Sequence, residues 1–103
     1  MFSEQLKRLI ADAIETETDQ AMKNWGEKYS SLHEGYAVLK EEVDEARDEQ
    51  IMIKNNLYLL WEEIKHGKAD PEKVNSIRKH AELLAFEAVQ VAAVCNKIKN
   101  TIL

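Results

Sequence analysis

The fold is constrained most by two long segments, residues 36–66 and 72–102, that lack Gly and Pro and repeat apolar residues every three or four positions. The first apolar stripe consists of Leu32, Tyr36, Leu39, Val43, Ala46, Ile53, Leu57, Leu60 and Ile64, with Gln50 in the one missing place. The second consists of Val74, Ile77, Ala81, Leu84, Ala88, Val91, Cys95, Ile98 and Ile102. A repeat of about 3.5 residues makes long helices that pack nearly antiparallel with interlocking side chains. The sequence therefore predicts an all-α fold built on a long helical hairpin.

Capping residues mark where the helices begin and end. The signals for a beginning are Ser3, the capping box Ser31-x-x-Glu34, and Asp70 followed by Pro71. The signals for an end are Gly26 and Gly67, because Gly adopts the left-handed conformation easily. We expect helices over about residues 4–24, 31–66 and 71–102, in one domain that covers residues 1–103. The N-terminal helix is expected to pack on the hairpin.

The third helix is apolar on more than one face. Outside its stripe it carries Leu83, Phe86, Val89, Ala93 and Val94. Between Leu84 and Cys95, only Glu87 and Gln90 are polar. Because a helix that is apolar all round is normally buried all round, we expect assembly into a multi-helix bundle, as a homodimer or homotetramer. Cys95 lies in this run and is expected to be a buried structural thiol.

Composition and charge narrow the class of protein. Hydrophobic residues make up 45% of the 103 residues and charged residues 32%, which is too apolar for a disordered chain. The net charge of −5 and the lack of a dense basic patch predict no binding to nucleic acid. No apolar stretch approaches the roughly 18 residues that span a membrane, and charges come too early for an export signal. The single Cys suits a reducing compartment, so we expect a cytoplasmic protein.

Paired acidic motifs are the strongest chemical signal. Glu42 and Glu45 are three residues apart on the second helix, so they share one face. Glu87 and Gln90 repeat this spacing on the third helix. If the hairpin turns between His66 and Pro71, facing residues have numbers that add to about 137, and this register brings the two motifs to within about two turns of each other.

Carboxylates that converge in an apolar bundle repel one another, and a hard divalent cation relieves this. The sequence therefore predicts a Mg²⁺ site, or a Mn²⁺ site, made by Glu42, Glu45, Glu87 and Gln90. Two simpler readings stay open: Glu42 and Glu45 could lie on a solvated helix face, and Glu87 could pair with a Lys or Arg. The pair of Glu-x-x-His motifs on two helices that a di-iron bundle needs does not occur, and neither do clustered His ligands, a Gly-rich phosphate loop or a nucleophile–His arrangement.

These motifs resemble those of the MazG-like nucleotide pyrophosphohydrolases, in particular the small phage-associated type. The resemblance covers residues 24–98. It consists of an Asn-Trp-Gly element at residues 24–26, an E-E-x-x-E helix at residues 41–45, and an E-x-x-Q segment followed by small apolar residues at 87–93. Gln90 stands where the family usually has Asp, and the segment from 51 to 67 is longer than the family core. That extension is either an interaction surface or ordinary hairpin core.

The resemblance implies an enzyme that uses Mg²⁺ to split a nucleoside triphosphate or deoxynucleoside triphosphate into the monophosphate and pyrophosphate. Glu42, Glu45 and Glu87 would be metal ligands, and Glu41 a further ligand or the group that orients water. Catalysis is thus assigned to Glu41 and Glu42. The substrate would contact a last set of residues, which are Trp25, Lys28 and Lys97. The alternatives are a non-catalytic nucleotide or metal sensor, or a structural coiled-coil protein that binds partners.

Overall fold

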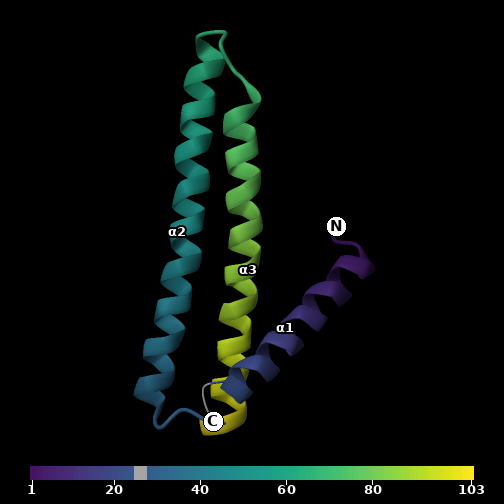
Figure 1. The fold of residues 1–103 in the computed structure, drawn as a ribbon, viewed down its shortest axis with the longest axis vertical. Helices are drawn as coiled ribbons and strands as arrows, with labels where there is room; N and C mark the ends of the chain where they lie inside the picture. Colours follow the sequence, from purple (N-terminus) through teal and green to yellow (C-terminus); the bar gives the residue numbers. More distant parts are fainter. Residues whose placement is uncertain (25–27) are drawn as a thin grey trace.

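The computed structural model describes residues 1–24 and 28–103, and within them the regular structure is entirely helical (Figure 1). Helix α1 spans Glu4–Asn24, α2 spans Leu32–Lys65 and α3 spans Pro71–Ile102. The predicted all-α fold is confirmed, and the predicted helix bounds are right to within one residue. The expected helix end at Gly26 lies outside the described residues.

The predicted capping residues begin and end the helices. Ser3 Oγ accepts a hydrogen bond from Leu6 N at 3.0 Å, and Asp70 Oδ1 accepts one from Glu72 N at 2.9 Å. Gly67 has φ +66°, a left-handed conformation that lets the chain leave α2. At the start of α2, Ser31 Oγ accepts from the Glu34 backbone as the capping box predicts. The Glu34 carboxylate accepts hydrogen bonds from the backbone N and the Oγ of Ser30. A capping box would instead use the backbone N of Ser31.

Helices α2 and α3 form the long antiparallel hairpin, and α1 lies against the C-terminal part of α3 (Figure 1). The N-terminal half of α1 points away from the hairpin in this view. Near the start of α2, Gly35 is buried, and a Cβ there would lie 3.1 Å from the Ile98 side chain. The two helices of the hairpin therefore approach closely where α1 also packs.

The apolar stripes divide between two sides of the hairpin. From residue 36 to 64 and from 74 to 98, every second member is partly buried between α2 and α3, and these members are Leu39, Ala46, Ile53 and Leu60 with Ile77, Leu84, Val91 and Ile98. The alternate members, Tyr36, Val43, Leu57 and Ile64 with Val74, Ala81, Ala88 and Cys95, are exposed. The stripes therefore interlock only in part within one chain. The expected burial of Cys95 is wrong for the single chain, because its row lies beside the hairpin seam and not in it.

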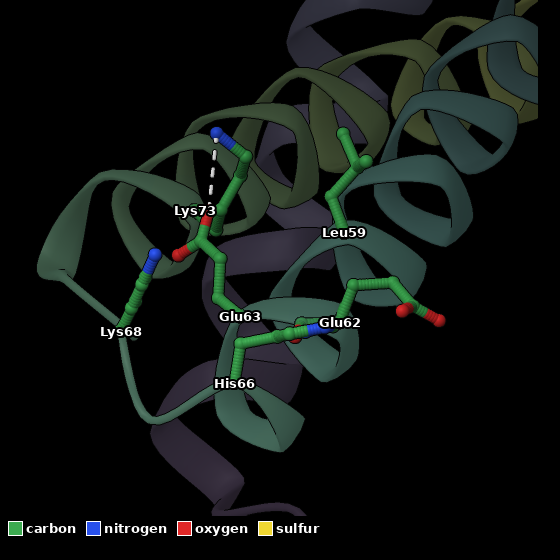
Figure 2. A pocket seen from close by; sticks show the side chains of 6 residues that line it. All are labelled: Leu59, Glu62, Glu63, His66, Lys68 and Lys73. Atoms are coloured by element: carbon green, nitrogen blue, oxygen red, sulfur yellow. Dashed lines mark hydrogen bonds and ion pairs between the residues drawn. The ribbon is translucent and has the colours of Figure 1, made fainter.

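Polar side chains occupy part of the hairpin seam. His80 Nδ1 lies 2.6 Å from Glu49 Oε2, and both side chains are largely buried. At the tip, Lys73 pairs with Glu63 at 3.6 Å (Figure 2). No helix among the described residues is long and apolar enough to cross a membrane.

Candidate metal centre

Three glutamates from two helices converge midway along the hairpin. Glu42 and Glu45 come from α2 and Glu87 comes from α3, and each offers a carboxylate oxygen within 4.8 Å of the others. Glu42 and Glu87 are partly buried, whereas Glu45 is exposed. The three-residue spacing on α2 and the antiparallel register bring these side chains to one level. We refer to these three residues as the carboxylate cluster.

The carboxylate cluster holds more negative charge than its surroundings favour. Burial raises the pKa of Glu42 above its usual 4.5, and the nearby Glu45 and Glu87 carboxylates raise it further. Burial also raises the pKa of Glu87, together with a hydrogen bond that its protonated carboxyl donates to the Glu45 side chain and the charges of Glu45 and Glu49. Since Glu45 is within hydrogen-bonding reach of both partners, the cluster can share a proton when no cation is bound.

No Lys, Arg or His among the described residues forms an ion pair with the carboxylate cluster. The predicted alternative, a salt bridge to Glu87, is therefore absent from this part of the chain. An oxygen-only donor set suits Mg²⁺, whose ligand oxygens at about 2.1 Å lie about 3–4.2 Å from one another. The carboxylate oxygens of the cluster all lie within 4.8 Å of one another, which is close to that range. The residues present thus fit a hard divalent cation, with water or substrate phosphate completing its coordination.

A cavity of about 420 Å³ lies beside the cluster on the side where α1 packs. Its lining consists of Ala21, Tyr29, Glu34, Val38, Glu41, Glu42, Gln90 and Val94. Glu42 belongs both to this lining and to the carboxylate cluster. A phosphorylated ligand in the cavity would therefore lie next to a cation held by the cluster.

Gln90, the remaining predicted ligand, lines the cavity and is held by α1. Its Nε2 donates a hydrogen bond to Glu17 Oε2 at 3.0 Å. The amide nitrogen is thus occupied, and only the amide oxygen could ligate a cation. The Gln90 side chain therefore connects α1 to the part of α3 that also carries Glu87 of the carboxylate cluster.

The three predicted substrate contacts are Trp25, Lys28 and Lys97, and the structure describes the position of the last two relative to the cavity. Trp25 lies outside the described residues. Lys28 is exposed and is not part of the cavity lining. Lys97 is completely buried; its Nζ donates to the Ala21 carbonyl at 3.1 Å and lies 4.4 Å from the centre of the Tyr29 ring. Because Ala21 and Tyr29 both line the cavity, the Lys97 ammonium sits directly behind its wall.

The pairing of His80 with Glu49 is the contact that sequence reasoning missed. Its position next to the cluster matters, because the Glu49 charge contributes to the raised pKa of Glu87. The hairpin register that brings Glu42 level with Glu87 also brings Glu49 level with His80. The signal was therefore in the sequence, but it required applying the register to His80.

A second pocket, of about 430 Å³, lies at the hairpin tip (Figure 2). It is lined by Leu59, Glu62, Glu63, His66, Lys68 and Lys73. Figure 2 shows the Glu63 carboxylate close to the Lys68 and Lys73 side chains, where Glu63 Oε1 is buried without a hydrogen-bond partner. Glu63 is about 27 Å along α2 from Glu45, so this pocket is separate from the carboxylate cluster.

No family model, no curated protein and no solved structure matches the chain.

Proposed function

We propose that this chain is a Mg²⁺-dependent nucleoside triphosphate pyrophosphohydrolase, which converts a nucleoside or deoxynucleoside triphosphate into the monophosphate and pyrophosphate. One observation carries the proposal. The carboxylates of Glu42, Glu45 and Glu87 converge without a cationic partner among the described residues, directly beside a cavity of about 420 Å³. The resemblance of residues 24–98 to the MazG-like, small phage-associated type supports the choice of reaction.

Glu42, Glu45 and Glu87 would hold Mg²⁺, with Mn²⁺ as a substitute and the Gln90 amide oxygen as a further ligand. The bound cation would neutralise the triphosphate and make water a better nucleophile. Glu41 lines the cavity without belonging to the cluster, which suits a group that orients the attacking water.

The reaction requires one new bond and one broken bond. The water oxygen bonds to the α-phosphorus, and the bond from this phosphorus to the oxygen that bridges to the β-phosphate breaks. Pyrophosphate leaves with that electron pair, while Glu41 or Glu42 accepts the proton from water. The cavity fixes the substrate in line for this attack.

Lys97 would stabilise the phosphates by its charge from behind the cavity wall. Its ammonium is turned toward the Tyr29 ring and the Ala21 carbonyl, so a direct contact requires a change in its side chain. Trp25 and Lys28 are further proposed contacts of the substrate. Trp25 would stack on the base, and Lys28 would reach the phosphates from the surface.

The test is a screen of nucleoside and deoxynucleoside triphosphates with Mg²⁺ or Mn²⁺ that measures pyrophosphate release. Pyrophosphate must be distinguished from orthophosphate, because a contaminating phosphatase releases the latter. The matched control is the double variant Glu42→Gln plus Glu87→Gln, which keeps the side-chain size and removes two charges. Turnover that does not exceed this control would refute the proposal.

A non-catalytic nucleotide or metal sensor is the second candidate, and the Gln90–Glu17 hydrogen bond favours it. A neutral side chain in the metal motif lowers the charge available for binding a cation, and its bond to α1 would couple the motif to that helix. Nucleotide with Mg²⁺ should then raise the melting temperature without hydrolysis. The absence of any thermal shift would exclude this candidate.

The setting of the protein belongs to the same proposal. We place the chain in the cytoplasm and expect it to form a homodimer or homotetramer, as its exposed apolar residues suggest. The structural coiled-coil alternative uses the same apolar surface but needs no metal. It predicts that Mg²⁺ leaves stability unchanged, so it is distinguished by the metal dependence of folding.

A further inference from the structure

Tyr29 is a buried side chain in the segment between α1 and α2. It is only 7% exposed, and it lines the cavity beside the carboxylate cluster. Its hydroxyl forms no hydrogen bond with any residue that the structure describes, yet it is not among the unpaired atoms that the protein encloses completely. The hydroxyl is therefore reached from the cavity. Because a buried hydroxyl without a partner costs free energy, a ligand that accepts a hydrogen bond from it is favoured there.

Tyr29 supplies a hydrogen-bond donor that the rest of the cavity lacks. Among the described lining residues, the three glutamates only accept hydrogen bonds when they are ionised, and the alanine and the two valines have no polar side-chain atom. Gln90 already donates from its Nε2 to Glu17. Tyr29 is thus the described lining residue whose side-chain donor makes no bond with the protein.

The charges around the cavity select the kind of group that accepts this bond. The glutamates of the lining repel an anionic ligand unless a cation is bound at the carboxylate cluster. A cation there would bring phosphate oxygens next to Glu42, which belongs to both the cluster and the lining. Burial raises the pKa of Tyr29, and the charges of Glu42 and Glu34 raise it further, so the hydroxyl lies within electrostatic reach of Glu42 and stays protonated. A hydrogen bond from it to an anionic phosphate oxygen is stronger than one between neutral groups.

Lys97 holds the Tyr29 ring in place from behind the cavity wall. Its Nζ lies 4.4 Å from the centre of the ring, within the range of a cation–π interaction, and donates to the Ala21 carbonyl at 3.1 Å. These contacts connect α3, which carries Lys97, to α1 and to the segment of Tyr29. Since Lys97 is completely buried, it acts on a ligand in the cavity through the position of Tyr29.

We propose that the Tyr29 hydroxyl donates a hydrogen bond to a phosphate oxygen of the bound nucleoside triphosphate, and that Lys97 is a positioning residue that keeps the Tyr29 ring oriented for this bond. The inference rests on the proposed function, because it needs a phosphate chain beside a cation at the carboxylate cluster. It adds a contact from the segment between α1 and α2 to a candidate metal centre whose carboxylates come from α2 and α3. It also gives the buried Lys97 a role that requires no change in its side chain.

The test compares the same substitution at two tyrosines. Tyr29→Phe keeps the ring that packs on Lys97 and removes only the hydroxyl. The matched control, Tyr36→Phe, removes a hydroxyl from a side chain that is 66% exposed and does not line the cavity. Calorimetry measures the binding of Mg²⁺ alone, of inorganic triphosphate with Mg²⁺, and of the α,β-methylene analogues of ATP, GTP, CTP and UTP with Mg²⁺.

Tyr29→Phe should weaken the binding of inorganic triphosphate and of the nucleotide analogues about tenfold or more, because a hydrogen bond to a charged oxygen is lost. It should leave the binding of Mg²⁺ alone unchanged. Its melting temperature in EDTA should stay within about 2 °C of the wild type, because the hydroxyl has no partner in the protein; a larger fall would show a structural role and overturn the inference. Tyr36→Phe should match the wild type in every measurement.

Lys97→Met tests the positioning role in combination with Tyr29→Phe. The two substitutions should not be additive, because both act on the same hydrogen bond. Lys97→Met should weaken triphosphate binding about tenfold in the wild-type background and about twofold or less in the Tyr29→Phe background. An equal loss in both backgrounds would overturn the positioning role of Lys97.

Three further outcomes contradict the contact between Tyr29 and phosphate, and they differ in what else they contradict. A wild type that binds no triphosphate with Mg²⁺ overturns this contact together with the proposed function. Equal binding of triphosphate by the wild type and Tyr29→Phe overturns the contact alone. A loss seen with the nucleotide analogues but not with inorganic triphosphate places the hydroxyl on the base or the ribose, and this also overturns the contact with phosphate.

Discussion

Replacing Glu87 by Gln separates a metal-binding cluster from a chance grouping of acidic residues. Two unit charges no more than 4.8 Å apart repel by at least about 1 kcal/mol in water and at least about 3.5 kcal/mol at an effective dielectric constant of 20. Glu45 is exposed, so the lower value applies to this cluster, and proton sharing reduces it further. We expect Glu87→Gln to stabilise the metal-free chain by about 1 kcal/mol at pH 8, which raises the melting temperature by about 5 °C.

Mg²⁺ should remove this difference in stability. If the wild type binds Mg²⁺ with a dissociation constant of about 1 mM, then about 10 mM Mg²⁺ stabilises it by about 1.4 kcal/mol, or about 7 °C. Loss of one carboxylate should weaken binding at least about tenfold, so the variant should gain about 2 °C or less. The measurement is thermal unfolding by circular dichroism, with EDTA and with Mg²⁺.

The control for this experiment is Glu82→Gln on the same helix. Glu82 forms an exposed pair with Arg78 at 3.5 Å, so its loss should change stability by about 0.5 kcal/mol or less and leave the Mg²⁺ response intact. The reasoning is refuted if Glu87→Gln is less stable than the wild type in EDTA and still gains as much from Mg²⁺.

Three further predictions concern the same region. In EDTA, the stability of the fold should decrease as the pH rises above 4.5. The raised pKa values of Glu42 and Glu87 make the folded chain hold more protons than the unfolded chain until the pH passes those pKa values. Glu42→Gln should make this decrease shallower in melting curves from about pH 4 to about pH 8. Gln90→Asp should strengthen Mg²⁺ binding in calorimetry while lowering the melting temperature in EDTA, because the new carboxylate replaces a donor to Glu17 with a like charge. Lys97→Met should keep the fold, since Met fills the space of the buried stem, but weaken binding of a nucleoside triphosphate about tenfold; unchanged binding would exclude a role for the Lys97 charge.

The register of the hairpin predicts part of the candidate site. The seven-residue repeat and the loop between His66 and Pro71 give the register of α2 against α3, because a helix has a fixed rise per residue. That register is enough to bring Glu42 and Glu45 near Glu87. It could not show that the Gln90 amide binds Glu17, since this contact depends on where α1 crosses α3.

The helices, their caps and the antiparallel hairpin could all be predicted from the sequence, because these follow from local hydrogen bonding and from apolar periodicity. It did not determine which members of the apolar stripes face inward. Both positions of each repeat are apolar. In the tertiary structure the seam between α2 and α3 also takes up the Glu49–His80 pair, whereas Cys95 and its row face outward. The tertiary structure also decided that Lys97 is buried behind the cavity wall, because its partners come from α1 and from the segment that follows it. Contacts between residues more than 60 positions apart depend on the crossing of whole helices, which local sequence patterns do not specify.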